Sequence, residues 1–146
     1  MKEKGQRVKI KLQSIIDDSG EKETNTFQNV GQFFKRNNFD VLLYEEIDEA
    51  GKKINNFMTI YPDQVNIKRS GFISMNQRFI VNRKTETYYK HPHGEFHMET
   101  YTHSLDYHSL RMNSKGKLTI YYTVTLNGEI KRKHLLKLTY IEEGSS

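Results

Sequence analysis

The sequence predicts an all-β protein, a closed up-and-down antiparallel barrel of about eight to ten strands. Two observations predict this fold. Apolar and polar residues alternate with a period of two over most of the chain, as is typical of strands with one buried face. Short turns rich in Gly, Asn, Asp and Pro separate these segments, and no segment longer than a turn shows helical periodicity. Closing the meander removes exposed sheet edges, and an open sandwich is the alternative.

Length and composition favour one barrel domain over residues 1–146, with a core at about 7–142. Hydrophobic residues make up only 35%, so the nine Tyr and eight Phe must fill much of the interior. The chain has no cysteine, which excludes disulfides, thiol nucleophiles and Cys-type zinc sites. No apolar run approaches membrane-spanning length, and the net charge of +5 is modest. These features predict a cytoplasmic protein without a membrane partner.

The first half of the chain is expected to form five strands. Val8, Ile10 and Leu12 alternate with polar residues and mark the first of them, which a turn at 17–20 ends. The next strands are expected at 23–34, 39–45, 53–61 and 64–70, with turns at 36–38, 48–51 and 62–63 between them. In the segment 39–45 the residues expected to face inward are Phe39, Val41, Leu43 and Glu45.

The second half contains the clearest hairpin. Asn127-Gly128 is the dipeptide most typical of a two-residue hairpin turn, and alternating strands flank it. The inward residues of these strands are Leu118, Ile120, Tyr122, Val124 and Leu126 before the turn, and Leu136, Leu138 and Tyr140 after it. Earlier strands are expected at 73–81 and 85–89 and in a long segment with Phe96, Met98, Thr100 and Thr102 on one face.

Several short motifs resemble those of a known family. They are Arg69-Ser70-Gly71, Met75-Asn76-Gln77-Arg78-Phe79, Tyr89, Pro92 with Gly94, Thr100, Gly116-Lys117 and Tyr122. From about residue 61 to 142 the chain resembles the YwiB-type proteins, small bacterial proteins of unassigned function. The resemblance implies a calycin-like (lipocalin-like) β-barrel and no particular activity. The family pattern usually has Thr or Met before the proline and an aromatic after it, where this chain has His91 and His93.

A charged pair is expected inside the barrel. Arg69 has the parity of Val65 and Ile67, and Glu45 has the parity of Val41 and Leu43, so regular alternation points both inward. Because a buried guanidinium requires a partner, we expect Arg69 and Glu45 to form an ion pair in the barrel or at its mouth. This pair either plugs one barrel end or anchors the polar head group of an amphipathic ligand.

The interior has two interpretations. Phe79, Tyr89, Thr100 and Tyr122 are expected to face inward, where aromatic rings and hydroxyls are able to line a small ligand cavity. Alternatively the same side chains interdigitate and leave no void, and their bulk favours a packed or nearly packed interior.

Two further groups could carry a function on the outside. In a closed meander the first and last strands pair, which would place Lys9 and Lys11 beside Lys131, Lys133 and Lys137 as a basic stripe. Such a stripe suits RNA or an acidic protein partner. The second group is five histidines between residues 91 and 108; only His91 and His93 could converge on an ion, so no metal site is predicted.

Catalysis is not expected. No Gly-rich phosphate loop, nucleophile elbow or Ser/His/Asp arrangement stands out, and no cofactor is implied. The favoured function is therefore non-enzymatic binding of a small amphipathic or apolar ligand in or at the mouth of the barrel, with Arg69 as polar anchor. The alternative is a macromolecular binding module that uses the basic stripe.

Overall fold

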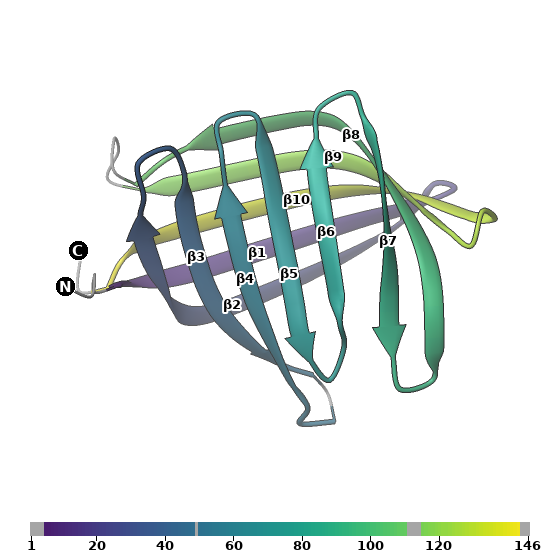
Figure 1. Cartoon of the computed structure of the whole chain (residues 1–146), viewed down its shortest axis with the longest axis horizontal. Helices are drawn as coiled ribbons and strands as arrows, with labels where there is room; N and C mark the ends of the chain where they lie inside the picture. Colours follow the sequence, from purple (N-terminus) through teal and green to yellow (C-terminus); the bar gives the residue numbers. More distant parts are fainter. Residues whose placement is uncertain (1–4, 49, 111–114, 144–146) are drawn as a thin grey trace.

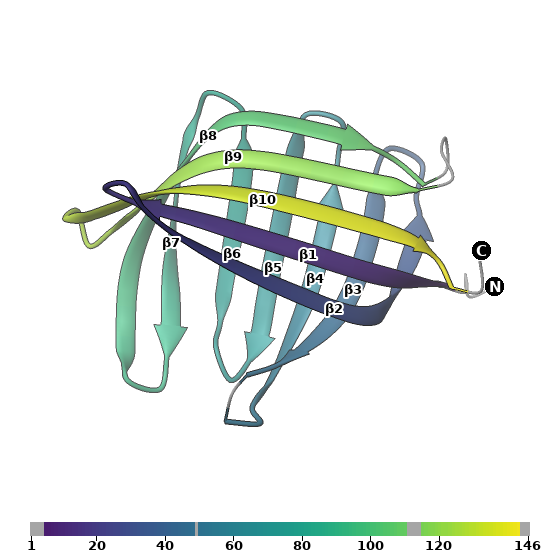
Figure 2. The ribbon, with the colours of Figure 1, turned by 180° about the vertical axis from the view of Figure 1, so that it is seen from behind.

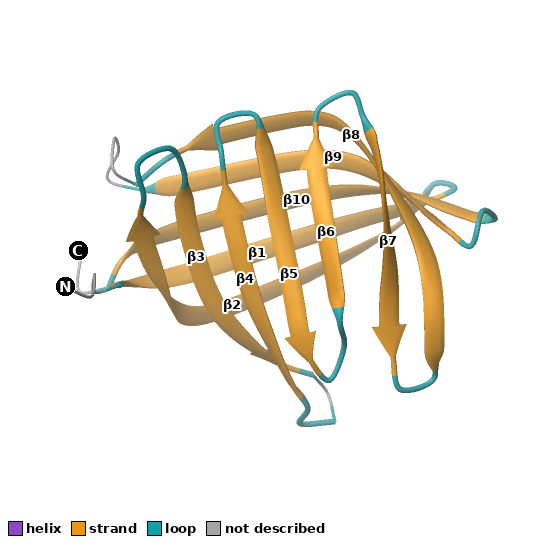
Figure 3. Ribbon diagram, viewed as in Figure 1, coloured by secondary structure: helices purple, strands orange, loops and turns teal. Residues whose placement is uncertain are grey.

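The structure, a computed structural model, describes residues 5–48, 50–110 and 115–143, and its regular elements are all β-strands (Figure 3). They form a meander, as expected (Figure 1). The ten strands are β1 (Gln6–Asp18), β2 (Glu21–Lys35), β3 (Asp40–Ile47), β4 (Lys53–Ile60), β5 (Gln64–Gly71), β6 (Met75–Ile80), β7 (Lys84–His91), β8 (Gly94–His108), β9 (Gly116–Leu126) and β10 (Ile130–Glu142).

The strands make one ten-stranded antiparallel sheet that curves into a nearly closed barrel. The first and last strands pair, so the sheet order is β6-β5-β4-β3-β2-β1-β10-β9-β8-β7. Strands β3 to β7 lie side by side in one layer, and β1, β9 and β10 cross them in the other (Figures 1 and 2). The expected all-β meander barrel is therefore confirmed.

The barrel has a seam between β6 and β7, the two ends of the sheet. Instead of a ladder, two single bridges lie at this seam: Ser74 with Lys90 of β7 near one end, and Val81 with Thr102 of β8 near the other. Between them the Thr85 hydroxyl donates to the Arg78 carbonyl oxygen at 2.6 Å. A side chain of β7 here takes the place of a backbone donor and pairs the Arg78 carbonyl at the β6 edge.

The alternating pattern decides which face of each strand is buried. Leu118 lies opposite Leu138, and both are fully buried in the barrel core. The turn between β9 and β10 is formed by Asn127 and Gly128, both with positive φ (50° and 71°), as a type I′ hairpin turn requires. The strong alternation and the turn dipeptide thus correctly predicted this hairpin.

The prediction for β3 was wrong about the face. Leu42 and Tyr44 point into the barrel, whereas Glu45 lies on the outer face, where its carboxylate is 3.9 Å from Lys53 Nζ. Val41, an outer-face residue, is only 5% exposed, between its register partners Phe34 and Thr59. Because β3 is apolar on both faces over residues 41–43, alternation there gives no unique direction.

One end of the barrel, near the turns that follow β2, β4 and β6, is closed by packed side chains. Asp40, 2% exposed, accepts hydrogen bonds from the hydroxyls of Tyr107 and Ser109 at 2.5 Å. The Tyr107 hydroxyl also bonds that of Tyr140, and burial raises the pKa of Tyr140 to about 12. Gly116 lies against the Tyr140 ring so closely that a Cβ would be 2.1 Å from Cζ. These side chains fill the barrel interior at this end, where Asp40, Tyr107 and Ser109 also line an open pocket of about 690 Å³.

Candidate ligand cavity

The half of the barrel nearer the turns after β1, β5, β7 and β9 is hollow. A cavity of about 530 Å³ occupies it, and all ten strands contribute to its wall. Apolar and aromatic side chains dominate the lining, among them Leu12, Tyr89, Phe96, Met98, Val124 and Leu136. The interior is thus packed at one end and open at the other, between the two alternatives that side-chain bulk suggested.

The mouth of the cavity lies where β2 separates from β3. The ladder between these strands covers only residues 32–35 and 40–43, so the preceding part of β2 pairs with β1 alone. Asn25 on this free part lines the cavity and is exposed, as is Ile130 (49%) at the start of β10. Arg132 at the rim forms an ion pair with Asp18, with Nε 3.3 Å from Oδ2. A small molecule therefore has an entrance with both apolar and charged groups.

Three side chains on neighbouring strands form a polar cluster in the wall. The register places Asn56 of β4 beside both Tyr44 of β3 and Arg69 of β5 on the inner face. Arg69 Nη2 donates to Glu46 Oε1 at 3.0 Å, Arg69 Nε donates to Asn56 Oδ1 at 3.1 Å, and Asn56 Nδ2 donates to Glu46 Oε1 at 2.9 Å. The Arg69 and Glu46 side chains are each 24% exposed. Their charges neutralise one another at the cavity surface.

This cluster corrects the predicted ion pair. Arg69 points inward, as its parity with Val65 and Ile67 indicated, but its partner is Glu46 instead of Glu45. The error follows directly from the inverted face of β3, since Glu45 and Glu46 are adjacent and lie on opposite faces. The signal that could have identified Glu46 is its parity with Leu42 and Tyr44.

Two tyrosines add phenol groups to the cavity wall. Tyr44 and Tyr122 line it, are each 7% exposed, and form no hydrogen bond with another described residue. Burial raises the pKa of both phenols well above the ordinary value, and the Glu46 carboxylate adds to the effect at Tyr44. Both therefore stay protonated at neutral pH and are available as donors and acceptors.

A histidine completes the polar part of the wall. The His134 ring stacks on that of Tyr122, with centroids 5.0 Å apart. Burial, with a smaller contribution from the Arg132 charge, lowers the pKa of His134 to about 4. The ring is therefore neutral at pH 7, and sequence reasoning did not select it because it lies among the lysines of β10.

The other interior residues that the sequence nominated fall into two groups. Tyr89 and Tyr122 line the cavity as expected. Phe79 and Thr100 face inward but lie behind the cavity wall: Phe79 packs edge-on against Tyr122 at 4.7 Å, and Thr100 Oγ1 accepts from Gln77 Nε2 at 2.9 Å. These two support the wall without touching the cavity space.

The basic stripe lies on the outer face. Lys9, Lys11, Lys131, Lys133 and Lys137 are all exposed, and the pairing of β1 with β10 brings the two strands together. The register also places Asp17 opposite Lys133 and the half-buried pair Ile15 and Leu135 between Lys133 and Lys137. The stripe is thus interrupted by one acidic and several apolar side chains.

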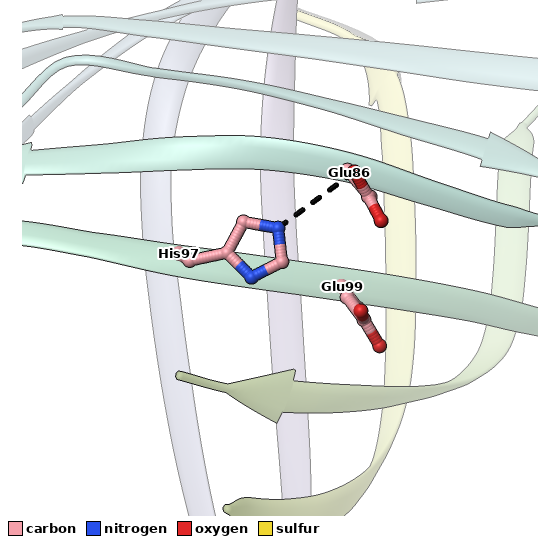
Figure 4. A group of neighbouring side chains, drawn as sticks. All are labelled: Glu86, His97 and Glu99. Atoms are coloured by element: carbon pink, nitrogen blue, oxygen red, sulfur yellow. Dashed lines mark ion pairs between the residues drawn. The ribbon is translucent and has the colours of Figure 1, made fainter. Parts of the chain in front are cut away.

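The histidines do not form one group. His91 and His93 stack with ring centroids 5.0 Å apart, and His91 Nδ1 accepts from the His93 backbone N–H. A different set, Glu86, His97 and Glu99, presents ligand atoms within 4.8 Å of one another on the outer wall (Figure 4). Each carboxylate there has a basic neighbour, His97 at 3.8 Å from Glu86 and Lys84 at 3.6 Å from Glu99.

Every described element is a strand, so a helical membrane span is absent from the part of the chain that the structure describes.

Comparison with known proteins supports the resemblance seen in the motifs. A model of the family described as "Domain of unknown function (DUF1934)" matches residues 10–138. The chain is 29% identical over 133 residues to the "Uncharacterized beta-barrel protein YwiB" of Bacillus subtilis (strain 168), covering 91% of this chain and 92% of that protein. The crystal structure of the ywiB protein from Bacillus subtilis superposes with a TM-score of 0.82 at 27% identity, covering 94% and 92% of the two chains. With nearly the whole barrel matched in sequence and in structure, the chain belongs to the DUF1934 family of β-barrel proteins.

Proposed function

We propose that the protein binds a small amphipathic or apolar molecule in the barrel cavity or at its mouth, and that it acts by binding without catalysing a reaction. The observation that carries the proposal is the apolar barrel cavity, into whose wall two phenols, Tyr44 and Tyr122, are set near Arg69. Each phenol hydroxyl is a hydrogen-bond donor and acceptor for the polar group of such a ligand.

The size and lining of the cavity support the same proposal. Ligand pockets usually have volumes of about 300–1,000 Å³, with apolar walls and a few placed polar groups. The cavity has about 530 Å³, and Arg69, held by Glu46 and Asn56, serves as the polar anchor. Because hydrogen bonds to Asn56 and Glu46 fix the guanidinium, it is oriented before a ligand arrives. We also propose that the protein acts in the cytoplasm.

A pair of variants tests the proposal. Ser14 of β1 lines the cavity, and its neighbour Gln13 points to the outer face. Ser14→Phe fills part of the cavity with an aromatic ring, and Gln13→Phe adds the same ring outside. Native mass spectrometry of protein isolated from cells should show an added small-molecule mass on the wild type and on Gln13→Phe, and none on Ser14→Phe.

Two results would refute the proposal. One is a bare protein mass for all three proteins even after incubation with a lipid and metabolite extract. The other is an added mass that Ser14→Phe retains while its circular dichroism spectrum and melting temperature match those of the wild type, since the mass would then lie outside the cavity.

A second candidate function rests on the five exposed lysines of the basic stripe, which suit RNA or an acidic protein surface. The exposed ring of Tyr121, 37% exposed on the adjacent strand, could stack on a base. Fluorescence anisotropy of a labelled single-stranded RNA tests it: binding that weakens with salt and is reduced in Lys9→Ala/Lys11→Ala supports this function. Asp17 and the apolar residues within the stripe favour the cavity instead.

A further inference from the structure

The charges in the cavity wall define the kind of ligand it accepts. Among the described residues that line the cavity, the charged side chains are Glu46, Arg69 and Arg132. Arg69 pairs with Glu46 at 3.0 Å, and Arg132 pairs with Asp18 at the rim at 3.3 Å. The neighbouring His134 ring is uncharged at neutral pH. Each cationic group of the wall thus already has an anionic partner.

A charged ligand group would gain little in this wall. An anion drawn to Arg69 also meets the Glu46 carboxylate, whose negative charge is within hydrogen-bond distance of the same guanidinium. To pair with Arg69 in place of Glu46, the anion would have to displace the Glu46 carboxylate and leave it unpaired and mostly buried, which is strongly unfavourable. A cation meets the same difficulty with the charges reversed. An uncharged group avoids both losses.

The wall nevertheless has unused hydrogen-bonding capacity. A guanidinium has five N–H groups, and Arg69 uses two of them, toward Asn56 and Glu46. The hydrogen bonds from Asn56 and Arg69 both end on Glu46 Oε1, so Oε2 accepts none from the described residues. Together with the phenols of Tyr44 and Tyr122, the wall offers donors and acceptors side by side.

We infer that the cavity binds an uncharged, largely apolar ligand that both donates and accepts hydrogen bonds. An aromatic alcohol, amine or amide is such a ligand. This inference rests on the proposed function and narrows it: Arg69 orients a neutral polar group and does not capture an anionic head group such as a carboxylate or a phosphate.

Two fluorescent probes with one ring skeleton test this directly. N-phenyl-1-naphthylamine is neutral, and 8-anilinonaphthalene-1-sulfonate carries a sulfonate on the same aromatic framework. Both report entry into an apolar site by their emission. The wild type should bind the neutral probe at least about tenfold more tightly, and Ser14→Phe should weaken the binding of both probes.

Two isolated substitutions should move the ratio of the two dissociation constants in opposite directions. Glu46→Gln leaves the Arg69 charge unopposed. The affinity for the sulfonate probe should therefore rise at least about fivefold relative to the affinity for the neutral probe. Arg69→Met leaves the Glu46 charge unopposed, so the relative affinity for the sulfonate probe should fall by a similar factor. The matched outer-face variant Glu45→Gln, whose carboxylate lies outside the cavity near Lys53, should leave the ratio within about twofold of the wild type.

The outcomes separate this inference from the proposed function. If the sulfonate probe binds the wild type as tightly as the neutral one, in a manner that Ser14→Phe abolishes, the cavity binds ligands but the neutral-ligand inference is wrong. Ratios that do not change in Glu46→Gln and Arg69→Met also overturn it. If neither probe binds, or if both bind Ser14→Phe as they bind the wild type, the proposed function itself fails.

Discussion

Replacing Glu46 with Gln and Arg69 with Met, singly and together, measures the interaction energy of the ion pair inside the barrel. At 3.0 Å and an effective dielectric constant of about 20, the Coulomb attraction is about 5.5 kcal/mol before any solvation effect. Both side chains are 24% exposed, so water screens part of this attraction, and burying the two charges offsets more of it. We therefore expect a net coupling energy of about 1–2 kcal/mol.

Each single variant leaves one charge in the wall without its counterion. We expect each to lower the free energy of unfolding by about 2 kcal/mol, and the double variant to lose less than the sum of the two by the coupling energy. Urea unfolding followed by circular dichroism measures this, with a shift in midpoint of about 1 M for each single variant. If the two losses add within about 0.5 kcal/mol, the pair contributes no specific energy and the reasoning is refuted.

Two further predictions concern stability. Because the pKa of His134 falls from 6.5 in the unfolded chain to about 4 in the folded protein, the unfolded state binds the proton more tightly. The stability that this neutral ring contributes is full above pH 6.5 and is lost as the pH falls toward 4. The wild type should therefore lose about 1–2 kcal/mol more than His134→Gln between about pH 7 and pH 4.5, and parallel urea midpoints would contradict this. Gly116→Ala places a Cβ 2.1 Å from the buried Tyr140 ring and should lower the free energy of unfolding by about 2–3 kcal/mol. The exposed control Lys117→Ala should change it by less than about 0.5 kcal/mol. Equal unfolding curves for the two variants would contradict this, because they would mean that the Tyr140 ring moves aside at no cost.

Alternation and turn residues were sufficient to predict most of the barrel. They predicted the hairpin around Asn127-Gly128, the antiparallel meander and the pairing of β1 with β10. These features depend on local patterns, in which one face of a strand is apolar and the other polar, so the chain specifies them residue by residue.

The cavity could not be predicted in the same way, because it depends on how strands diverge. β2 pairs with β3 only from Gln32 to Lys35, and the part of β2 that lies along the cavity has no ladder with β3. A count of bulky side chains describes the whole interior and does not show that Phe79 packs behind the wall while Tyr89 lines the space. The partner of Arg69 was missed for a local reason, the apolar residues on both faces of β3.

The methyl groups of methionine test most directly whether a ligand enters the barrel. Met75 and Met98 line the cavity, and Met58, fully buried in the core, does not. The other two methionines, Met1 and Met112, lie outside the described residues. With the protein labelled with ¹³C at its methionine methyl groups, addition of N-phenyl-1-naphthylamine should shift the NMR signals of Met75 and Met98 strongly and that of Met58 little. Binding of the probe that leaves the signals of Met75 and Met98 unchanged would contradict a ligand site inside the barrel.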